Sequence, residues 1–118
     1  MDLSIVIPMF NEAENVESTL NQVEKAMVSF QGTYEIIAVN DGSLDHTLEI
    51  LERIAFKNKK IKVISYPKNI GRGMALRRGF MASTGEIVVS IDADLSYDPH
   101  YILDFVNILR TEQDIDLV

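Results

Sequence analysis

The stretch EIVVSIDADLSYDP, residues 86–99, decides how the rest of the sequence is interpreted. It opens with an apolar run rich in β-branched residues, 87–91, which predicts a strand buried on both faces. The run stops at Asp92 and Asp94, and residues i and i+2 of an extended segment point to the same side. Two carboxylates placed in this way suit Mg²⁺ or Mn²⁺, which such groups share with substrate phosphates. Taken alone, the stretch also fits an ordinary polar turn after a buried strand.

Length and composition are those of an ordinary globular protein with one domain. The chain has 118 residues, of which 47% are hydrophobic and 25% are charged. Its formal net charge of -7 argues against nucleic-acid binding through a basic surface. The absence of cysteine excludes disulfides, thiolate catalysis and zinc–thiolate sites. No apolar run reaches the ~20 residues of a transmembrane helix and no basic segment opens the chain, so we expect a cytoplasmic protein.

Apolar periodicity predicts strands that alternate with helices along the whole chain. Strands are expected at residues 3–8, 34–39, 61–65 and 87–91, and a fifth is expected to start at 116–118. Helices are expected from an Asn11 N-cap to about residue 30, at 44–56, at 71–83 and after Pro99. Ala75, Gly79 and Ala82 form a stripe of small residues that would let the third helix lie close to the sheet. The alternation predicts an α/β fold with a mainly parallel sheet and helices on both faces.

Polar residues collect at the carboxyl ends of the predicted strands, where ligands bind in sheets of this kind. The first strand is followed by Asn11 and Glu12, the second by Asp41, and the fourth by Asp92 and Asp94. Carboxylates gathered at one edge repel one another unless a cation or hydrogen-bond donors lie between them. A metal ion together with a nucleobase and ribose is the simplest explanation of the set.

Asp41 and Arg72 have the most specific predicted contacts. Asp41 can accept from the imide N–H of uracil, or from N1 and the exocyclic amine of guanine, so the sequence leaves the base open. Asp41-Gly42 also fits an ordinary turn dipeptide. Arg72, Arg77 and Arg78 are candidate counter-charges for a diphosphate, and Arg72 is favoured because it lies in a loop between two glycines.

Four segments resemble, in order and spacing, the family 2 inverting glycosyltransferases of the GT-A fold. They are IVIPMFNE (5–12), VNDGSLDHT (39–47), NIGRGMALRRGFMASTGE (69–86) and DADLS (92–96). DADLSYDP, followed by Tyr101 and Ile102, is similar in particular to dolichol-phosphate mannose synthases and to undecaprenyl- or dolichyl-phosphate glucosyltransferases. The resemblance implies a Rossmann-like nucleotide-binding half, a UDP- or GDP-sugar donor, and a polyprenyl or dolichyl phosphate acceptor at the cytoplasmic face of a membrane.

The resemblance also implies roles for the matched residues. Nucleotide binding is implied for Pro8, Asn11, Glu12, Asp41, Asn69, Arg72 and Asp92. Binding of Mg²⁺ or Mn²⁺ is implied for Asp92 and Asp94, with Asp94 as the principal ligand beside the diphosphate. The metal would offset charge on the departing nucleoside diphosphate as the sugar C1–O bond breaks. Ser96 departs from the pattern, because some relatives carry a Gln there that can join the metal shell.

Family members place the acceptor site in a C-terminal half. We therefore expect residues 1–118 to be the nucleotide-sugar-binding part of a GT-A domain, truncated before the acceptor half, with the catalytic residues unknown. The open edge of its sheet would then be available for contact with another copy of the chain.

Three other interpretations remain open on the sequence alone. The chain could be a catalytically incomplete fragment that binds a nucleotide or a partner without turnover. A phosphatase of the haloacid dehalogenase type would use Asp92 and Asp94, but Ser96 stands where that class has Thr or Val. A dinucleotide-binding domain would need a third glycine where Leu76 stands.

Overall fold

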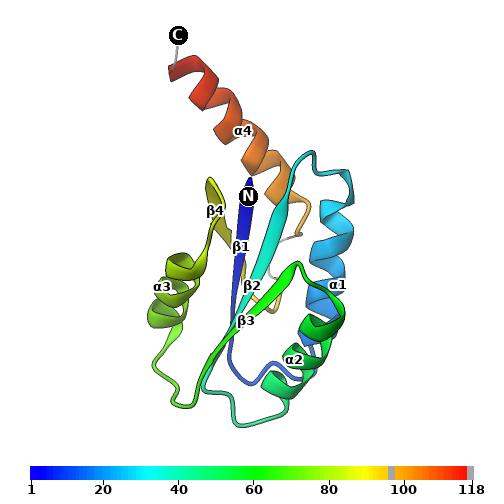
Figure 1. Ribbon diagram of the computed structural model, residues 1–118, viewed down its shortest axis with the longest axis vertical. Helices are drawn as coiled ribbons and strands as arrows, with labels where there is room; N and C mark the ends of the chain where they lie inside the picture. The colour runs from blue at the N-terminus through cyan, green and yellow to red at the C-terminus, as the bar shows by residue number, and fades with distance from the viewer. Residues whose placement is uncertain (96–97, 117–118) are drawn as a thin grey trace.

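A computed structural model of the chain describes residues 1–95 and 98–116, with side chains as far as residue 111. Helices and strands alternate in chain order (Figure 1). The strands are β1 (Leu3–Met9), β2 (Tyr34–Asp41), β3 (Ile61–Tyr66) and β4 (Ile87–Ser90). The helices are α1 (Val16–Ala26), the 3₁₀ turn η1 (Met27–Ser29), α2 (Thr47–Lys57), α3 (Arg72–Ala82) and α4 (Tyr101–Asp116). The predicted α/β alternation is confirmed.

Within the described residues, the strands form one sheet in the order β3-β2-β1-β4, and every neighbouring pair is parallel. In the register, Ile5 lies opposite both Ile36 and Val89, and Asn40 lies opposite Ser65. All carboxyl ends therefore meet at one edge, which is the lower edge of the sheet in Figure 1. The predicted mainly parallel sheet is confirmed.

Helices cover both faces of the sheet, as predicted. Alternate residues of a strand point to opposite faces, and β1 divides its side chains in this way. Ile5 and Ile7 lie in a core with α1, α2 and Ile102 of α4, whereas Val6 and Val39 lie in a second cluster with Ala75 of α3. In the described part of the chain, no helix is long and apolar enough to cross a membrane.

The predicted stripe of small residues places α3 directly on the sheet. A Cβ added to Gly79 would lie 2.3 Å from Cγ1 of Val6, and Ala75 is fully buried. Ala82 is exposed, so the close contact involves only the first two residues of the stripe. This contact brings the amino terminus of α3, where Arg72 stands, to the carboxyl edge of β1 and β2.

The prediction for the fourth strand is wrong in one respect. Within the described residues β4 pairs with β1 alone, so it is an edge strand and not a strand buried on both faces. Val88 is 36% exposed, and the strand ends before Ile91. A fifth strand was predicted to start at residue 116, and this is wrong for Asp116, which is the last residue of α4. Leu117 and Val118 lie outside the described residues. Contact with another copy of the chain stays a prediction.

Two helices begin later than predicted. The first begins at Val16 and the second at Thr47, not at Asn11 and Leu44. Asn11 has a positive φ of 53°, and its Oδ1 accepts a hydrogen bond from the Leu44 backbone N–H at 2.8 Å. It therefore joins two loops and does not cap a helix. Leu44 is 89% exposed because it lies in one of these loops.

Candidate functional site

A cavity of about 420 Å³ lies at the carboxyl edge of the sheet, at the ends of β1, β2 and β4 and beside the start of α3. Its lining residues are Pro8, Met9, Phe10, Glu12, Asp41, Asn69, Gly71, Arg72, Ala75, Asp92, Ala93 and Asp94. The fold thus gathers every residue that was predicted to bind the nucleotide or the metal, with the exception of Asn11. The volume lies in the range of small-molecule binding sites.

Asn11 is exposed and does not line the cavity, but it connects the loop after β1 to the loop after β2. Its backbone N–H donates to the Ser43 hydroxyl at 2.9 Å, and its side chain accepts from Leu44. Asn tolerates the positive φ that this position requires better than most residues do. In this structure Asn11 therefore shapes the cavity without lining it.

Glu12 is held at the rim by the same pair of loops. Its backbone N–H donates to the Thr47 hydroxyl at 2.9 Å, and the next N–H, of Ala13, donates to Asp45 Oδ2 at 3.2 Å. Partial burial acts to raise the pKa of Asp45, but hydrogen bonds from Thr47 and Ala13 outweigh it and lower that pKa below its usual value. The ionised Asp45 thus anchors the loop that carries Glu12.

Asp41, the last residue of β2, is 3% exposed and its carboxylate is largely occupied. Oδ1 accepts from the Ile70 backbone N–H at 2.9 Å. Oδ2 accepts from the Asn69 side-chain amide and from the Gly71 N–H, both at 2.9 Å. The Asn69 amide also donates to the Asp41 carbonyl oxygen at 3.0 Å. Asp41 therefore fixes the conformation of the loop that leads from β3 into α3.

Gly42 allows this loop to approach the end of β2. Its φ is +63°, and an added Cβ would lie 2.2 Å from the Asn69 backbone nitrogen. Any side chain at this position would push the Asn69 loop away from the Asp41 carboxylate. The glycine is thus required by backbone contact as well as by the left-handed conformation.

Tyr66 lies opposite Asp41 in the β2–β3 register. Its hydroxyl oxygen is buried and has no hydrogen-bond partner among the described residues. Burial, together with the interaction with the Asp41 carboxylate, raises the pKa of Tyr66 to about 12. The guanidinium carbon of Arg78 lies 5.4 Å from the ring centroid, so this arginine covers Tyr66 and is not among the cavity residues.

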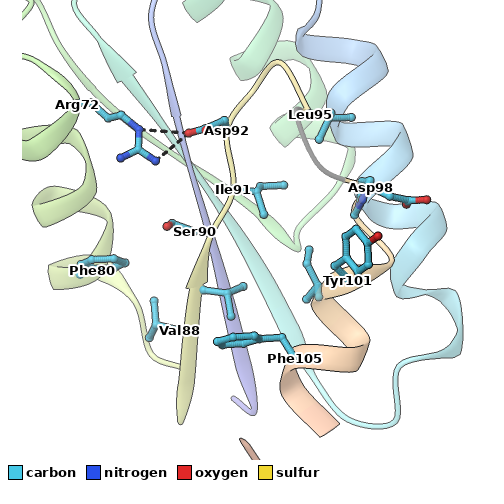
Figure 2. Close-up of a pocket in the computed structure, with 13 residues that line it drawn as sticks. Arg72, Phe80, Val88, Ser90, Ile91, Asp92, Leu95, Asp98, Tyr101 and Phe105 are labelled. Atoms are coloured by element: carbon cyan, nitrogen blue, oxygen red, sulfur yellow. Dashed lines mark hydrogen bonds and ion pairs between the residues drawn. The ribbon is translucent and has the colours of Figure 1, made fainter. Parts of the chain in front are cut away.

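Arg72 and Asp92 form an ion pair at the mouth of the cavity (Figure 2). Arg72 is the first residue of α3, and Asp92 lies just beyond β4. The pair is half exposed, at 59% and 44% of the two side chains. Arg72 was predicted to bind a diphosphate and Asp92 to bind the metal, and in the structure these two side chains contact each other.

The segment after β4 is a turn and not the extended chain that was predicted. The Leu95 N–H donates to the Asp92 carbonyl at 3.0 Å, and Leu95 has a φ of 52°. Both Asp92 and Asp94 nevertheless line the cavity. The buried Thr19 hydroxyl, on α1, donates to the Ala93 carbonyl at 2.6 Å and so anchors the turn between the two carboxylates.

The carboxylates fit a divalent cation that the protein shares with a ligand. In residues 1–95 and 98–116, no group of three or more His, Cys, Asp or Glu side chains forms a complete metal site. Asp92 and Asp94 supply two hard oxygen donors at one cavity. Mg²⁺ is commonly bound by one or two carboxylates together with substrate phosphates. Ser96, the departure from the family pattern, lies outside the described residues.

A larger hollow, of about 700 Å³, runs along the outer edge of β4 and shares Arg72 and Asp92 with the first cavity (Figure 2). Phe80 of α3, Val88 of β4 and Phe105 of α4 give it a mostly apolar wall. The acidic and amide side chains converge on the smaller cavity, which we therefore take as the candidate site.

Phe10, which lines the cavity, and Thr19, which anchors the turn beside it, were not singled out from the sequence. Phe10 is 42% exposed and lines the cavity, and its only local signal was a large aromatic residue in a loop at a strand end. Thr19 was predicted as part of a helix, and nothing in its neighbourhood in the sequence indicates the contact with Ala93, which lies 74 positions away.

Comparison with known proteins agrees with this arrangement. The dolichol-phosphate mannosyltransferase of Pyrococcus furiosus is 34% identical over 98% of this chain and 32% of its own length. The mannosyltransferase PcManGT from Pyrobaculum calidifontis, solved in complex with GDP-Man and Mn²⁺, superposes with a TM-score of 0.70 at 26% identity, over 78% of this chain and 27% of its own. TarS from S. aureus, solved in complex with UDP-GlcNAc, gives 0.68 at 31% identity, over 80% of this chain and 27% of its own.

The chain spans about a third of the length of several relatives that it matches, between 28% and 36% for three of them. The pattern of the family described as "Glycosyl transferase family 2" matches residues 4–118. The fold, the placement of the carboxylates and this match lead to one assignment: the chain belongs to glycosyl transferase family 2.

Proposed function

We propose that the 420 Å³ cavity binds the nucleoside diphosphate of a UDP- or GDP-sugar, and that the chain is the donor-binding part of an enzyme transferring a hexose to a polyprenyl or dolichyl phosphate. The observation that carries the proposal is the convergence of Glu12, Asp41, Arg72, Asp92 and Asp94 on one cavity at the carboxyl edge of the sheet. Ligands of parallel α/β sheets bind at this edge.

The proposed roles follow from the position of each residue. Asp41 and the exposed ring of Phe10 form the base end of the cavity, where a carboxylate offers hydrogen bonds and an aromatic face offers stacking. Arg72 offers a guanidinium to the diphosphate, a group that it can bind bidentately. Asp92 and Asp94 hold Mg²⁺ or Mn²⁺, which offsets the negative charge of the departing nucleoside diphosphate.

The relatives support the donor and acceptor classes. The two structures compared above contain GDP-Man with Mn²⁺ and UDP-GlcNAc, respectively, so both bases occur among proteins of this fold. The relative from Pyrococcus furiosus is named a dolichol-phosphate mannosyltransferase, and dolichol phosphate is a lipid phosphate.

Isothermal titration of the 118-residue chain with UDP and with GDP, each with and without Mn²⁺, tests the donor site. We expect Mn²⁺-dependent binding of at least one nucleotide. Asp94→Ala removes a proposed metal ligand and should abolish the Mn²⁺ dependence, whereas Glu52→Ala, on the exposed side of α2, removes the same charge away from the cavity and should not.

A folded chain that binds neither nucleotide at millimolar concentration would refute the donor site. Equal loss of binding in the two variants would show that net charge, and not the Asp94 carboxylate, supports the affinity. Acceptor use is tested separately, on an enzyme that contains this chain together with the acceptor half, by incubation with a radiolabelled nucleotide sugar and dolichyl phosphate and extraction of labelled lipid.

A further inference from the structure

We propose that the outer edge of β4 is the contact surface for a second copy of this chain, which pairs with it as an antiparallel strand across a two-fold axis. In the part of the chain that the structure describes, β4 pairs with β1 on one side and with no strand on the other. An edge strand presents a row of N–H and C=O groups with which another chain can pair. The contact goes beyond the proposed function, because neither a donor nor an acceptor takes part in it.

The backbone hydrogen bonds show which groups of β4 face outward. The N–H groups of Ile87 and Ile91 donate to carbonyl oxygens in and just before β1, at 3.1 and 3.0 Å. Alternate residues of a strand direct their N–H and C=O groups to opposite edges. Val88 and Ser90 therefore present theirs to the outer edge of the sheet. The hollow of about 700 Å³ lies along this edge and leaves it accessible.

The two edges of the sheet differ in how they are protected. Within the described residues β3 is the other edge strand, and it carries Lys62. A charged side chain on an edge strand opposes pairing with another chain. β4 has the sequence IVVS and carries no charge. This difference points to β4, and not to β3, as the edge that accepts a further strand.

Apolar side chains flank the β4 edge on both faces of the sheet (Figure 2). Phe80 of α3 and Val88 lie on one face, and Tyr101 and Phe105 of α4 lie on the other. Ile108 follows Phe105 one turn later on α4, and the five side chains are between 36% and 62% exposed. They expose on the order of 500 Å² together, more than half of the ~800 Å² that each partner of a stable complex buries.

A second copy fits this surface because the surface is complementary to itself. A two-fold contact uses the same patch on both chains. With the axis at Val89 and perpendicular to the sheet, Val88 of one copy lies opposite Ser90 of the other, and the two residues exchange both of their N–H···O=C bonds. Each face of the sheet also continues into the same face of the second copy. The apolar wall at Phe80 then meets its own equivalent, and so does the wall at Phe105.

The charges near the edge do not oppose this pairing. The charged residues that line the hollow are Arg72, Asp92 and Asp98, and the first two pair with each other. The antiparallel register directs Glu86, just before β4, toward the Arg72–Asp92 pair of the second copy, where Arg72 supplies the opposite charge. The two chains each carry a net charge of -7, and their repulsion at a distance is screened by salt.

Analytical ultracentrifugation of the 118-residue chain, from micromolar to millimolar concentration, measures the association. We expect a reversible equilibrium between monomer and dimer. Ser90→Pro removes an outward N–H, and an edge strand tolerates proline where its N–H faces away from the sheet. The variant should stay folded, as checked by circular dichroism, and should associate at least about tenfold more weakly. Ser65→Pro makes the same change on β3 and should leave the association unchanged.

Cysteine variants test the register, because the chain has no cysteine of its own. Val89→Cys places two thiols across the axis with a Cα separation of about 4.5–5.5 Å, which a disulfide spans. We expect oxidation with copper–phenanthroline to give a disulfide-linked dimer. Ile87→Cys, on the same face of β4, is the matched control. Its two thiols would lie about 14 Å apart, so it should form far less of the linked dimer.

Each outcome supports or overturns the contact. A folded chain that stays monomeric at millimolar concentration overturns it and leaves the edge to a strand from outside residues 1–118. A dimer that Ser90→Pro leaves intact, or that Ile87→Cys links as readily as Val89→Cys, shows a contact at another place or in another register. Assemblies that grow beyond a dimer show a contact that does not close around a two-fold axis, and they also overturn the proposal.

Discussion

Arg72 donates two hydrogen bonds to a single oxygen of Asp92, from Nε at 3.2 Å and from Nη2 at 2.8 Å (Figure 2). Arg72 begins α3 and Asp92 follows β4, so the contact joins the start of a helix to the turn after a strand at the cavity. In the proposed function Arg72 binds the diphosphate and Asp92 binds the metal. Without a nucleotide, each of these charged groups therefore neutralises the other.

Arg72→Gln should raise the affinity of the nucleotide-free chain for Mn²⁺ and lower its affinity for the nucleotide. The substitution releases Asp92 from its ion pair. A half-exposed ion pair of this kind is worth under about 1 kcal/mol, so the affinity for Mn²⁺ should rise by up to about fivefold. Mn²⁺ binding is followed by electron paramagnetic resonance of the free ion, and nucleotide binding by calorimetry.

Arg77→Gln is the control for the general effect of removing a positive charge. Arg77 lies on the same helix, is exposed and does not line the cavity. If the two variants bind Mn²⁺ with the same affinity, the Arg72–Asp92 contact does not compete with the metal.

Thr19→Val should weaken Mn²⁺-dependent nucleotide binding although Thr19 is not a cavity residue. The substitution keeps the shape of the side chain but removes the donor to the buried Ala93 carbonyl, which lies between the two proposed metal ligands. We expect a loss of stability of about 1–3 kcal/mol, measured by urea unfolding, and a loosened turn. Thr111→Val removes an exposed hydrogen bond to the Asn107 carbonyl, and it should change neither the stability nor the nucleotide binding by as much.

Glu35 forms a buried polar cluster at the opposite end of the sheet. Its Oε2 accepts from the Ser4 hydroxyl at 2.6 Å and from the backbone and side chain of Thr84, while Oε1 pairs with Lys62 at 2.6 Å. Burial acts to raise the pKa of Glu35, but Lys62, Ser4 and Thr84 outweigh it and lower this pKa from 4.5 to about 2. The ionised carboxylate thus ties three strands to the turn before β4.

Glu35→Gln should destabilise the chain near neutral pH and flatten the acid side of its stability profile. Because the pKa of Glu35 is lower in the folded state, its ionised form contributes stability that is complete above pH 4.5 and is lost as the pH falls toward about 2. Urea unfolding between pH 2 and 7, with the exposed Glu86→Gln as control, measures this contribution. Parallel pH profiles for wild type and Glu35→Gln would contradict it.

Tyr66→Phe should leave stability unchanged or raise it by up to about 1 kcal/mol. The substitution removes a buried hydroxyl that has no partner in the described part of the chain and keeps the ring against Arg78. Thermal unfolding measures the change. A clear loss of stability would show that the hydroxyl donates a hydrogen bond in solution, with the Asp41 carboxylate as the nearest candidate acceptor.

The order of the elements and the general position of the site could be predicted from local patterns. The apolar run at residues 3–8 and the helical spacing that follows it depend on neighbouring residues, and a parallel sheet then places all carboxyl ends together. For this reason Glu12, Asp41, Asp92 and Asp94 were found as candidates for one site before any contact between them was known.

The helix starts could not be predicted in the same way. Asn11 and Leu44 have the local features of a helix start and of an apolar helix face, respectively. In the fold they bond to each other across two loops, at a separation of 33 positions. A contact between loops outweighs the local preference of each residue, and no local pattern contains it.

The sequence by itself determined the α/β alternation, the parallel sheet and the set of polar residues at its edge, because these depend on periodicity and on the position of residues relative to strand ends. Only the tertiary structure decided how those residues are used. The three donors on the Asp41 carboxylate, the Arg72–Asp92 pair and the exposed edge of β4 all depend on which loops and strands become neighbours. The packing of α3 and of the other helices on the sheet sets that arrangement.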